Sequence, residues 1–325
     1  MPDLPSLRKP HSRFWLYAPY AGLLVMVAAW SLAWVLIRQA AVGQFDQAAA
    51  ALRAQGWTIA WDQRSVGGYP FRLHARLTRP RFREPSGWSL AAPSLEAEAY
   101  AFAPGHWVIL APEGLTMARP FGGAAAISGQ ALKASFNPMD GQDAPQLALE
   151  GRGISVAPQP GAQPLPITRA ERLAFYLRPL PGDTAEFQLQ LDGATPSPSA
   201  LLARLGGQQP VTLVWDETVS HVSQFSGRDW PGAVRRWSRG GGAVSLNHGE
   251  IEAGEARLNA QSGQYSVDDD GRLAGDLTLD FSHAGAASQR LGGLPAGALA
   301  HADLNFAGGK IRLGPFVIGK APRIY

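Results

Sequence analysis

The chain has 325 residues, no cysteine, 29 basic and 26 acidic side chains, and only 17% charged residues. Without thiols, a disulfide scaffold, a thiolate metal site and a cysteine nucleophile are excluded. A net charge of +3 is too small to indicate a nucleic-acid partner. The 37 glycines and 26 prolines indicate many short strands and turns rather than long surface helices.

Residues 14–37 contain no charged side chain. As a helix they extend about 36 Å at about 1.5 Å per residue, enough to cross a hydrocarbon core of about 30 Å. Arg8, Lys9 and Arg13 precede this segment. Only Arg38 follows it closely, so the positive-inside rule predicts a single-pass inner-membrane protein with a cytoplasmic N-terminus and a periplasmic body.

A cleaved secretory signal is the alternative interpretation of the same segment. Ala41-Val42-Gly43 supplies a small-residue site, but the apolar stretch is longer than the usual about 7 to 15 residues of a signal peptide. Retention as an anchor is therefore favoured. Residues 38–55 are rich in strong helix formers and predict a helical stalk that ends at Gly56.

From residue 56 onward the hydrophobic period changes to that of strands. In residues 71–78 apolar and polar side chains alternate, which is typical of a strand with one buried and one wet face. No long helical pattern separates the strands, so antiparallel neighbours are expected. The predicted fold is mainly β: an N-terminal transmembrane helix, then an extended antiparallel β-sheet body with a few short helices.

The predicted organisation has one clear composition break, the Pro-rich residues 158–166, which we interpret as a long loop or a subdomain boundary. The regions in chain order are a cytoplasmic tail 1–13, an anchor 14–37, a stalk 38–55, a first β-rich periplasmic region 56–157, the connection 158–166, and a second β-rich periplasmic region 167–325.

Short elements are predicted within the second region. Residues 198–205 form a short helix with Ser197 as its cap, and residues 228–239 form a basic amphipathic helix with Pro231 in its first turn. Near the end of the chain, the alternation around Asp280 predicts that Leu279 is buried.

The anchor and several short Gly- and Pro-containing motifs together resemble the uncharacterised bacterial envelope family catalogued as domain of unknown function 2125. The motifs are Gly68-Tyr69-Pro70-Phe71-Arg72-Leu73, the stretch 270–280 and the ending 309–319. The resemblance implies an inner-membrane anchor with a periplasmic β-rich body, and it brings no catalytic residues. A looser likeness, in architecture alone, is to AsmA-like envelope proteins, whose β-sheets present apolar grooves to lipid.

The sequence offers little chemistry for catalysis. The seven histidines do not occur at metal-ligand spacings, and no nucleophile elbow, phosphate-binding loop or dinucleotide motif occurs, so no metal and no cofactor are expected. Glu96 and Glu98 lie about 7 Å apart on one strand face, a separation compatible with a glycosidase pair. Solubilising charge on a wet strand face is the favoured interpretation of these two residues, and a non-enzymatic role is predicted.

Two clusters carry binding hypotheses. Arg72, Arg76, Arg79 and Arg81 crowd the first strands, and guanidinium groups bind phosphates bidentately, so they are candidates for anionic lipid headgroups. The alternative is an edge strand protected by charge.

The second cluster, Trp230, Trp237 and Arg235, could rest on the membrane surface, or the tryptophans could pack into the core.

Together these features predict a lipid or amphiphile binder in envelope maintenance. A scaffold for another envelope protein is the alternative, and a glycan hydrolase is a weaker one.

Overall fold

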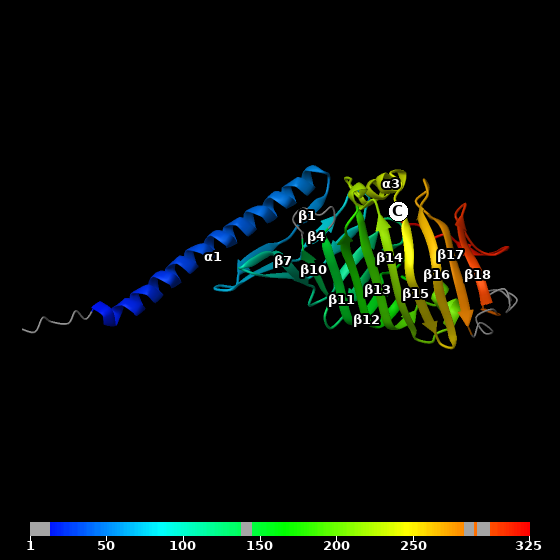
Figure 1. The fold of residues 1–325 in the computed structure, drawn as a ribbon, viewed down its shortest axis with the longest axis horizontal. Helices are drawn as coiled ribbons and strands as arrows, with labels where there is room; N and C mark the ends of the chain where they lie inside the picture. The colour runs from blue at the N-terminus through cyan, green and yellow to red at the C-terminus, as the bar shows by residue number, and fades with distance from the viewer. Residues whose placement is uncertain (1–13, 138–144, 283–288, 291–299) are drawn as a thin grey trace, which may run out of the picture.

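The computed structural model describes residues 14–137, 145–282, 289–290 and 300–325. One curved antiparallel sheet makes up the body, and the long helix α1 (Phe14–Ala54) projects from one end of it (Figure 1). The predicted mainly β fold with an N-terminal apolar helix is confirmed. The predicted cytoplasmic tail, residues 1–13, lies outside the described residues.

Helix α1 joins the predicted anchor and stalk without a break. Its N-terminal half is long and apolar enough to cross a membrane. In that half, Leu24 and Val25 are 71% and 69% exposed, so the body does not cover them. The helix ends at the predicted position, where Gly56 takes a left-handed φ of 94°.

Strands β11 to β20 form a meander, in which each strand pairs antiparallel with the next one along the chain. Because β11 and β12 pair across the Pro-rich connection, the two predicted β-rich regions share one sheet. The strands are β11 (Gln146–Pro158), β12 (Ile167–Leu180), β13 (Thr184–Pro196), β14 (Val211–Ser220), β15 (Val244–Ala253), β16 (Ala256–Val267), β17 (Leu273–Ser282), β18 (His301–Ala307), β19 (Lys310–Leu313) and β20 (Phe316–Lys320).

The other edge of β11 divides the sheet into two arms, because its first half pairs with β10 and its last residues pair with β9. The first arm runs outward from β11 as β10 (Lys133–Asn137), β7 (Ala103–Leu110), β6 (Ser94–Tyr100), β3 (Arg72–Thr78) and β2 (Gln63–Gly67). The second arm runs as β9 (Gly123–Ser128), β8 (Leu115–Arg119), β5 (Ser89–Ala91), β4 (Arg81–Arg83) and β1 (Thr58–Ala60).

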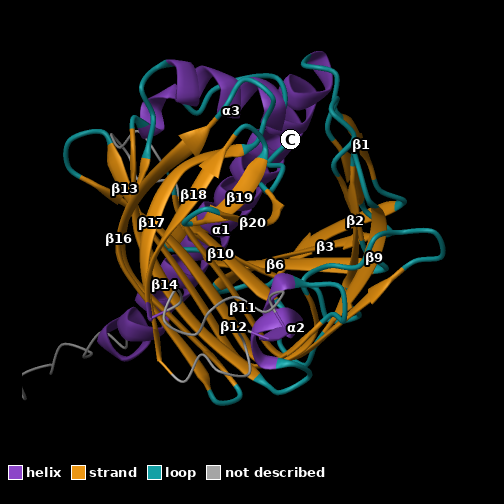
Figure 2. Cartoon of the chain, turned by 90° about the vertical axis from the view of Figure 1, so that its right-hand side faces the viewer, coloured by secondary structure: helices purple, strands orange, loops and turns teal. Residues whose placement is uncertain are grey.

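The sheet curls around a core on its inner face (Figure 2). Ala125 of β9 and Leu313 of β19, far apart in the strand order, belong to one buried cluster with Leu205 of the short helix α2 (Leu201–Gly206). Only the inner face of a curled sheet can bring these strands to one core. The apolar side chains that alternate along the strands therefore point inward.

The predicted amphipathic helix is present as α3 (Trp230–Arg239), capped by the side chain of Asp229, which accepts from the amide of Gly232. It packs over the end of the sheet opposite α2, beside the one-turn 3₁₀ helix η1 (Val222–Gln224). Its Val234 and Trp237 join a separate buried cluster with Val267. The C-terminal Tyr325 packs against the same cluster.

Candidate functional site

A strip of apolar side chains crosses the inner face of the sheet from the first arm into the meander. Residues directly opposite each other in an antiparallel pair point to the same face, so the strand register defines two adjacent rows. We call them together the inner strip. One row is Ile109, Ala134, Leu149, Phe175, Leu189 and Trp215, and the other is Trp107, Phe136, Leu147, Leu177, Phe187 and Glu217.

Much of the inner strip is open to solvent although it is apolar. Ile109, Phe136 and Leu149 are 36%, 38% and 39% exposed. Further along, the rings of Phe175 and Phe187 meet edge to face with centroids 5.0 Å apart. Contiguous exposed apolar surfaces are rare on soluble monomeric proteins, and they usually mark sites that bind another molecule.

The inner strip connects the anchor helix with the core of the body. At one end, Trp107 packs against a cluster formed by Trp34 of α1 and by Leu73 and Ala99 of the first arm. At the other end, Trp215 packs against the buried cluster of the last strands. An apolar surface therefore runs without interruption from α1 into the meander.

One carboxyl group ends the inner strip. Glu217 is 5% exposed, and its Oε1 accepts hydrogen bonds from Trp215 Nε1 and from the Tyr265 hydroxyl. Burial raises the pKa of the Glu217 carboxyl from 4.5 to about 7, while the hydrogen bond from Trp215 opposes the shift. Near neutral pH this group therefore exchanges a proton inside an otherwise apolar face.

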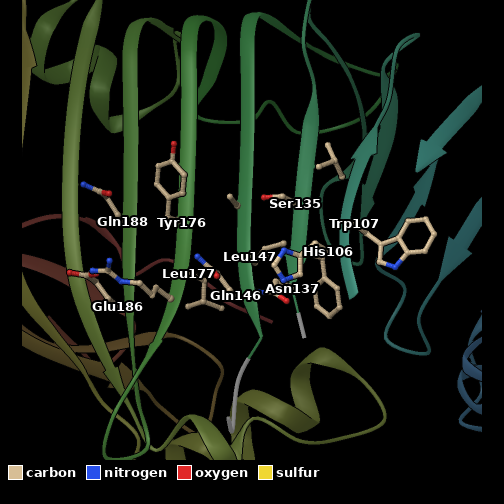
Figure 3. Close-up of a pocket in the computed structure, with 14 residues that line it drawn as sticks. His106, Trp107, Ser135, Asn137, Gln146, Leu147, Tyr176, Leu177, Glu186 and Gln188 are labelled. Carbon is tan, nitrogen blue, oxygen red and sulfur yellow. The ribbon is translucent and has the colours of Figure 1, made fainter. Parts of the chain in front are cut away.

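The opposite, outer face of the same strands is polar. Lys133 and Glu150 pair there at 2.7 Å, and the Tyr176 hydroxyl donates to Glu150 at 3.1 Å. These bonds lower the pKa of Glu150, the one from Lys133 contributing most. A pocket of about 510 Å³ lies at the ends of these strands, where Tyr176, Gln188 and other polar side chains line it together with Leu147 and Leu177 (Figure 3).

Ion pairs on the first arm already occupy the arginines predicted to bind headgroups. On the outer face of β3, Arg72 lies 3.6 Å from Glu98, and Arg76 lies 3.6 Å from Glu96. These are exposed pairs, which a competing phosphate can displace at low cost.

The other two predicted arginines, Arg79 and Arg81, both pair with Asp62 beside the turn from β3 to β4. The four side chains therefore do not converge on one site. Headgroup binding by them stays a prediction.

The residues predicted to contact the membrane surface belong to α3, which lies away from the apolar part of α1 (Figure 1). Trp237 is 3% exposed, and its Nε1 donates to the carbonyl of Ser220, so it packs into the core as the alternative interpretation had it. Trp230 is 39% exposed and donates to the carbonyl of Ile324. Arg235 lies 5.3 Å from the ring centroid of Tyr325. Membrane contact through this helix stays a prediction.

Glu96 and Glu98, the candidate glycosidase pair, lie on the outer face of β6, where they bond to the arginines of β3. Their carboxylates thus neutralise neighbouring guanidinium groups. Within the described parts of the chain, no three histidine or acidic side chains gather in a group that could hold a metal ion.

The inner strip itself was only partly evident from the sequence. The alternation of Phe187 and Leu189 predicts one apolar face, and Leu147 and Leu149 show the same pattern. Trp107 and Phe136 lie in short strands whose pairing depends on the fork at β11, for which the sequence carries no signal.

A family model described as "Uncharacterized protein conserved in bacteria (DUF2125)" matches residues 34–322, nearly the whole chain. No curated protein and no solved structure matches the chain.

Proposed function

The chain belongs to the DUF2125 family of uncharacterised bacterial proteins, and we propose that this member is an inner-membrane-anchored periplasmic protein that binds a lipid or another amphiphile along its inner strip. The family match confirms the resemblance found in the sequence, but its description names no activity. The proposed role is binding rather than catalysis.

The exposed apolar side chains of the inner strip are the observation that carries this proposal. An acyl chain that lies on Ile109, Phe136 and Leu149 would remove their apolar surface from water. Each methylene group transferred in this way contributes about 0.8 kcal/mol. A ligand with several such groups would therefore prefer the inner strip to water.

Continuity with the anchor helix favours a ligand that comes from the bilayer. Trp107 of the inner strip packs in the same cluster as Trp34 of α1, which lies within the apolar segment of the helix. An acyl chain leaving the bilayer beside α1 could thus reach the strip along apolar side chains. This arrangement would avoid the cost of exposing the chain to water.

The charge asymmetry around α1 supports the orientation, with the body in the periplasm. A reporter that is active only in the periplasm, fused after Tyr325, should be active. Activity of a cytoplasm-only reporter at the same position would contradict this orientation.

Two neighbouring residues of β7 provide a matched test of lipid binding. Ile109 points to the inner face and Val108 to the outer face, and they are 36% and 38% exposed. A photo-crosslinking amino acid would be placed at either position in the full-length protein, in living cells. After irradiation, the intact mass of the purified protein would show any covalently attached molecule.

We expect the Ile109 variant to gain the mass of a lipid or another amphiphile and the Val108 variant to gain none. Equal lipid labelling at both positions would indicate contact with bulk membrane rather than a binding face. Labelling of Ile109 by a protein alone would contradict amphiphile binding and favour the scaffold function.

The scaffold function has one observation of its own in its favour. Among the described residues, β20 pairs on one side only, with β19, and its Val317 is 56% exposed. An unpaired strand edge of this kind can accept a strand from another protein.

A further inference from the structure

Two hairpin turns of the first arm lie against the apolar half of α1. The turn between β2 and β3 contributes Tyr69 and Phe71, and the turn between β6 and β7 contributes Phe102. The apolar half of α1 extends beyond the body on one side. Both turns are at the end of the first arm on that same side (Figure 1).

Hydrogen bonds fix the level of the turn between β2 and β3 along the helix. Trp30 Nε1 donates to the carbonyl oxygen of Pro70 at 3.0 Å, and Trp34 Nε1 donates to that of Arg72 at 3.1 Å. One residue after Trp30, the Ser31 hydroxyl lies 2.8 Å from the Tyr69 hydroxyl. The turn between β2 and β3 is therefore held at residues 30–34 of the helix, and Ala101 in the turn between β6 and β7 packs in the same buried cluster as Trp34.

Residues 30–34 are at the outer boundary of the membrane segment. Between Phe14 and Trp30 the helix rises about 24 Å at about 1.5 Å per residue, which is most of a hydrocarbon core of about 30 Å. The hydrogen bonds that Trp30, Ser31 and Trp34 make to the body therefore lie near the end of the membrane-spanning length of the helix. A helix that spans the bilayer thus holds the two turns at the outer interface.

The turns expose aromatic rings at this level. Tyr69, Phe71, Tyr100 and Phe102 are 51%, 61%, 51% and 71% exposed, and Tyr100 and Phe102 stack with centroids 5.0 Å apart. Arg72 lies above the Tyr100 ring at 5.8 Å, where its guanidinium can reach the headgroup layer. Aromatic rings with a nearby cation are typical of residues at a membrane interface.

We propose that the turns between β2 and β3 and between β6 and β7 insert their aromatic side chains into the outer interface of the bilayer that α1 crosses. Phe71 and Phe102 enter the acyl-chain boundary, and the tyrosine hydroxyls remain at the headgroups. The bilayer is the occupant of this surface because the surface continues the lipid-facing side of α1. This insertion goes beyond the proposed ligand binding and does not depend on it.

The absence of cysteine makes the insertion directly measurable, since single cysteines can be introduced into the full-length chain. Phe71→Cys and Phe102→Cys report on the turns, and Met26→Cys reports on the span. Phe121→Cys is the matched control, because Phe121 is an equally exposed aromatic residue, 66% exposed, in the turn between β8 and β9 on the second arm. Each variant would carry an environment-sensitive fluorophore in vesicles of phosphatidylethanolamine and phosphatidylglycerol.

We expect the labels at positions 26, 71 and 102 to lose emission to a lipid-borne quencher and to resist aqueous iodide, and the label at 121 to behave in the opposite way. The proposed insertion would be overturned if iodide quenched the labels at positions 71 and 102 as strongly as the label at position 121 while the label at position 26 was in lipid. Protection of 71 and 102 from both quenchers would indicate burial against a second copy of the chain and would also overturn it. Quenching of the label at position 26 by iodide would show that α1 does not cross the bilayer, and it would overturn the insertion, which depends on that span.

Discussion

Replacing Glu217 by glutamine should make the stability of the β body less dependent on pH. The Glu217 carboxyl is buried at the end of the apolar inner strip, and burial raises its pKa from 4.5 to about 7. The folded protein therefore holds the protonated form to a higher pH than the unfolded chain does. Stability from this group is fully present below pH 4.5 and is lost as the pH rises through about 7.

The size of the effect follows from the shift. At 1.36 kcal/mol per pKa unit, ionising Glu217 in the folded state costs roughly 3 kcal/mol above pH 7. Between pH 5 and pH 8 the wild-type free energy of unfolding should fall by about 2.5 kcal/mol more than that of Glu217→Gln. Glutamine keeps an Oε1 acceptor for Trp215 and Tyr265 and carries no charge. The variant should therefore be the more stable protein at pH 8.

Urea titration with pulse proteolysis, on the full-length protein in detergent at pH 5 and pH 8, measures both free energies. Glu250→Gln is the control, because Glu250 lies opposite Val214 on the polar outer face of the next strand. It should retain the wild-type pH dependence. If Glu217→Gln and wild type lose the same free energy between the two pH values, the carboxyl is not buried as described.

Two further substitutions test the strand register and the position of α3. Leu279→Asp should destabilise the protein by about 3 kcal/mol or more, because it buries an unpaired carboxylate, whereas Asp280→Ala, on the outer face, should leave the urea midpoint nearly unchanged. Trp237→Ala should cost about 3 to 5 kcal/mol in the same assay, whereas Trp230→Ala should cost clearly less, since Trp230 is 39% exposed. Similar effects within either pair would contradict the assigned faces.

Local patterns in the sequence predicted the elements well. The alternation around Leu279 identified its buried face, and the amphipathic pattern with Pro231 in the first turn predicted α3 at nearly the right position. These signals are local because side-chain direction in a strand and capping at a helix start depend on neighbours in the sequence. The short helix α2 shows the limit. Its predicted cap, Ser197, donates to the carbonyl of Leu165 instead, and α2 begins at Leu201.

The candidate site depended on information that the local pattern lacks. The inner strip forms because β7, β10 and β11 become neighbours, and the order of strands in a sheet is a non-local property. The buried state of Glu217 likewise depends on Tyr265, which belongs to a strand two places away. The aromatic turns beside α1 needed the packing of the first arm on the helix.

The fork at β11 also sets an order of assembly during synthesis. The N-terminal strands leave the ribosome first, yet β9 and β10 share an edge partner that is made only after both of them. The edge of β10 has no partner until residue 150 emerges, and that of β9 has none until residue 158 emerges, the condition in which nascent sheets aggregate. From β12 onward each new strand pairs with the one just completed, so the rest of the sheet can grow as fast as it is translated. The vulnerable interval in the life of this protein is therefore the time needed to make residues 129–158, between the completion of β9 and that of β11.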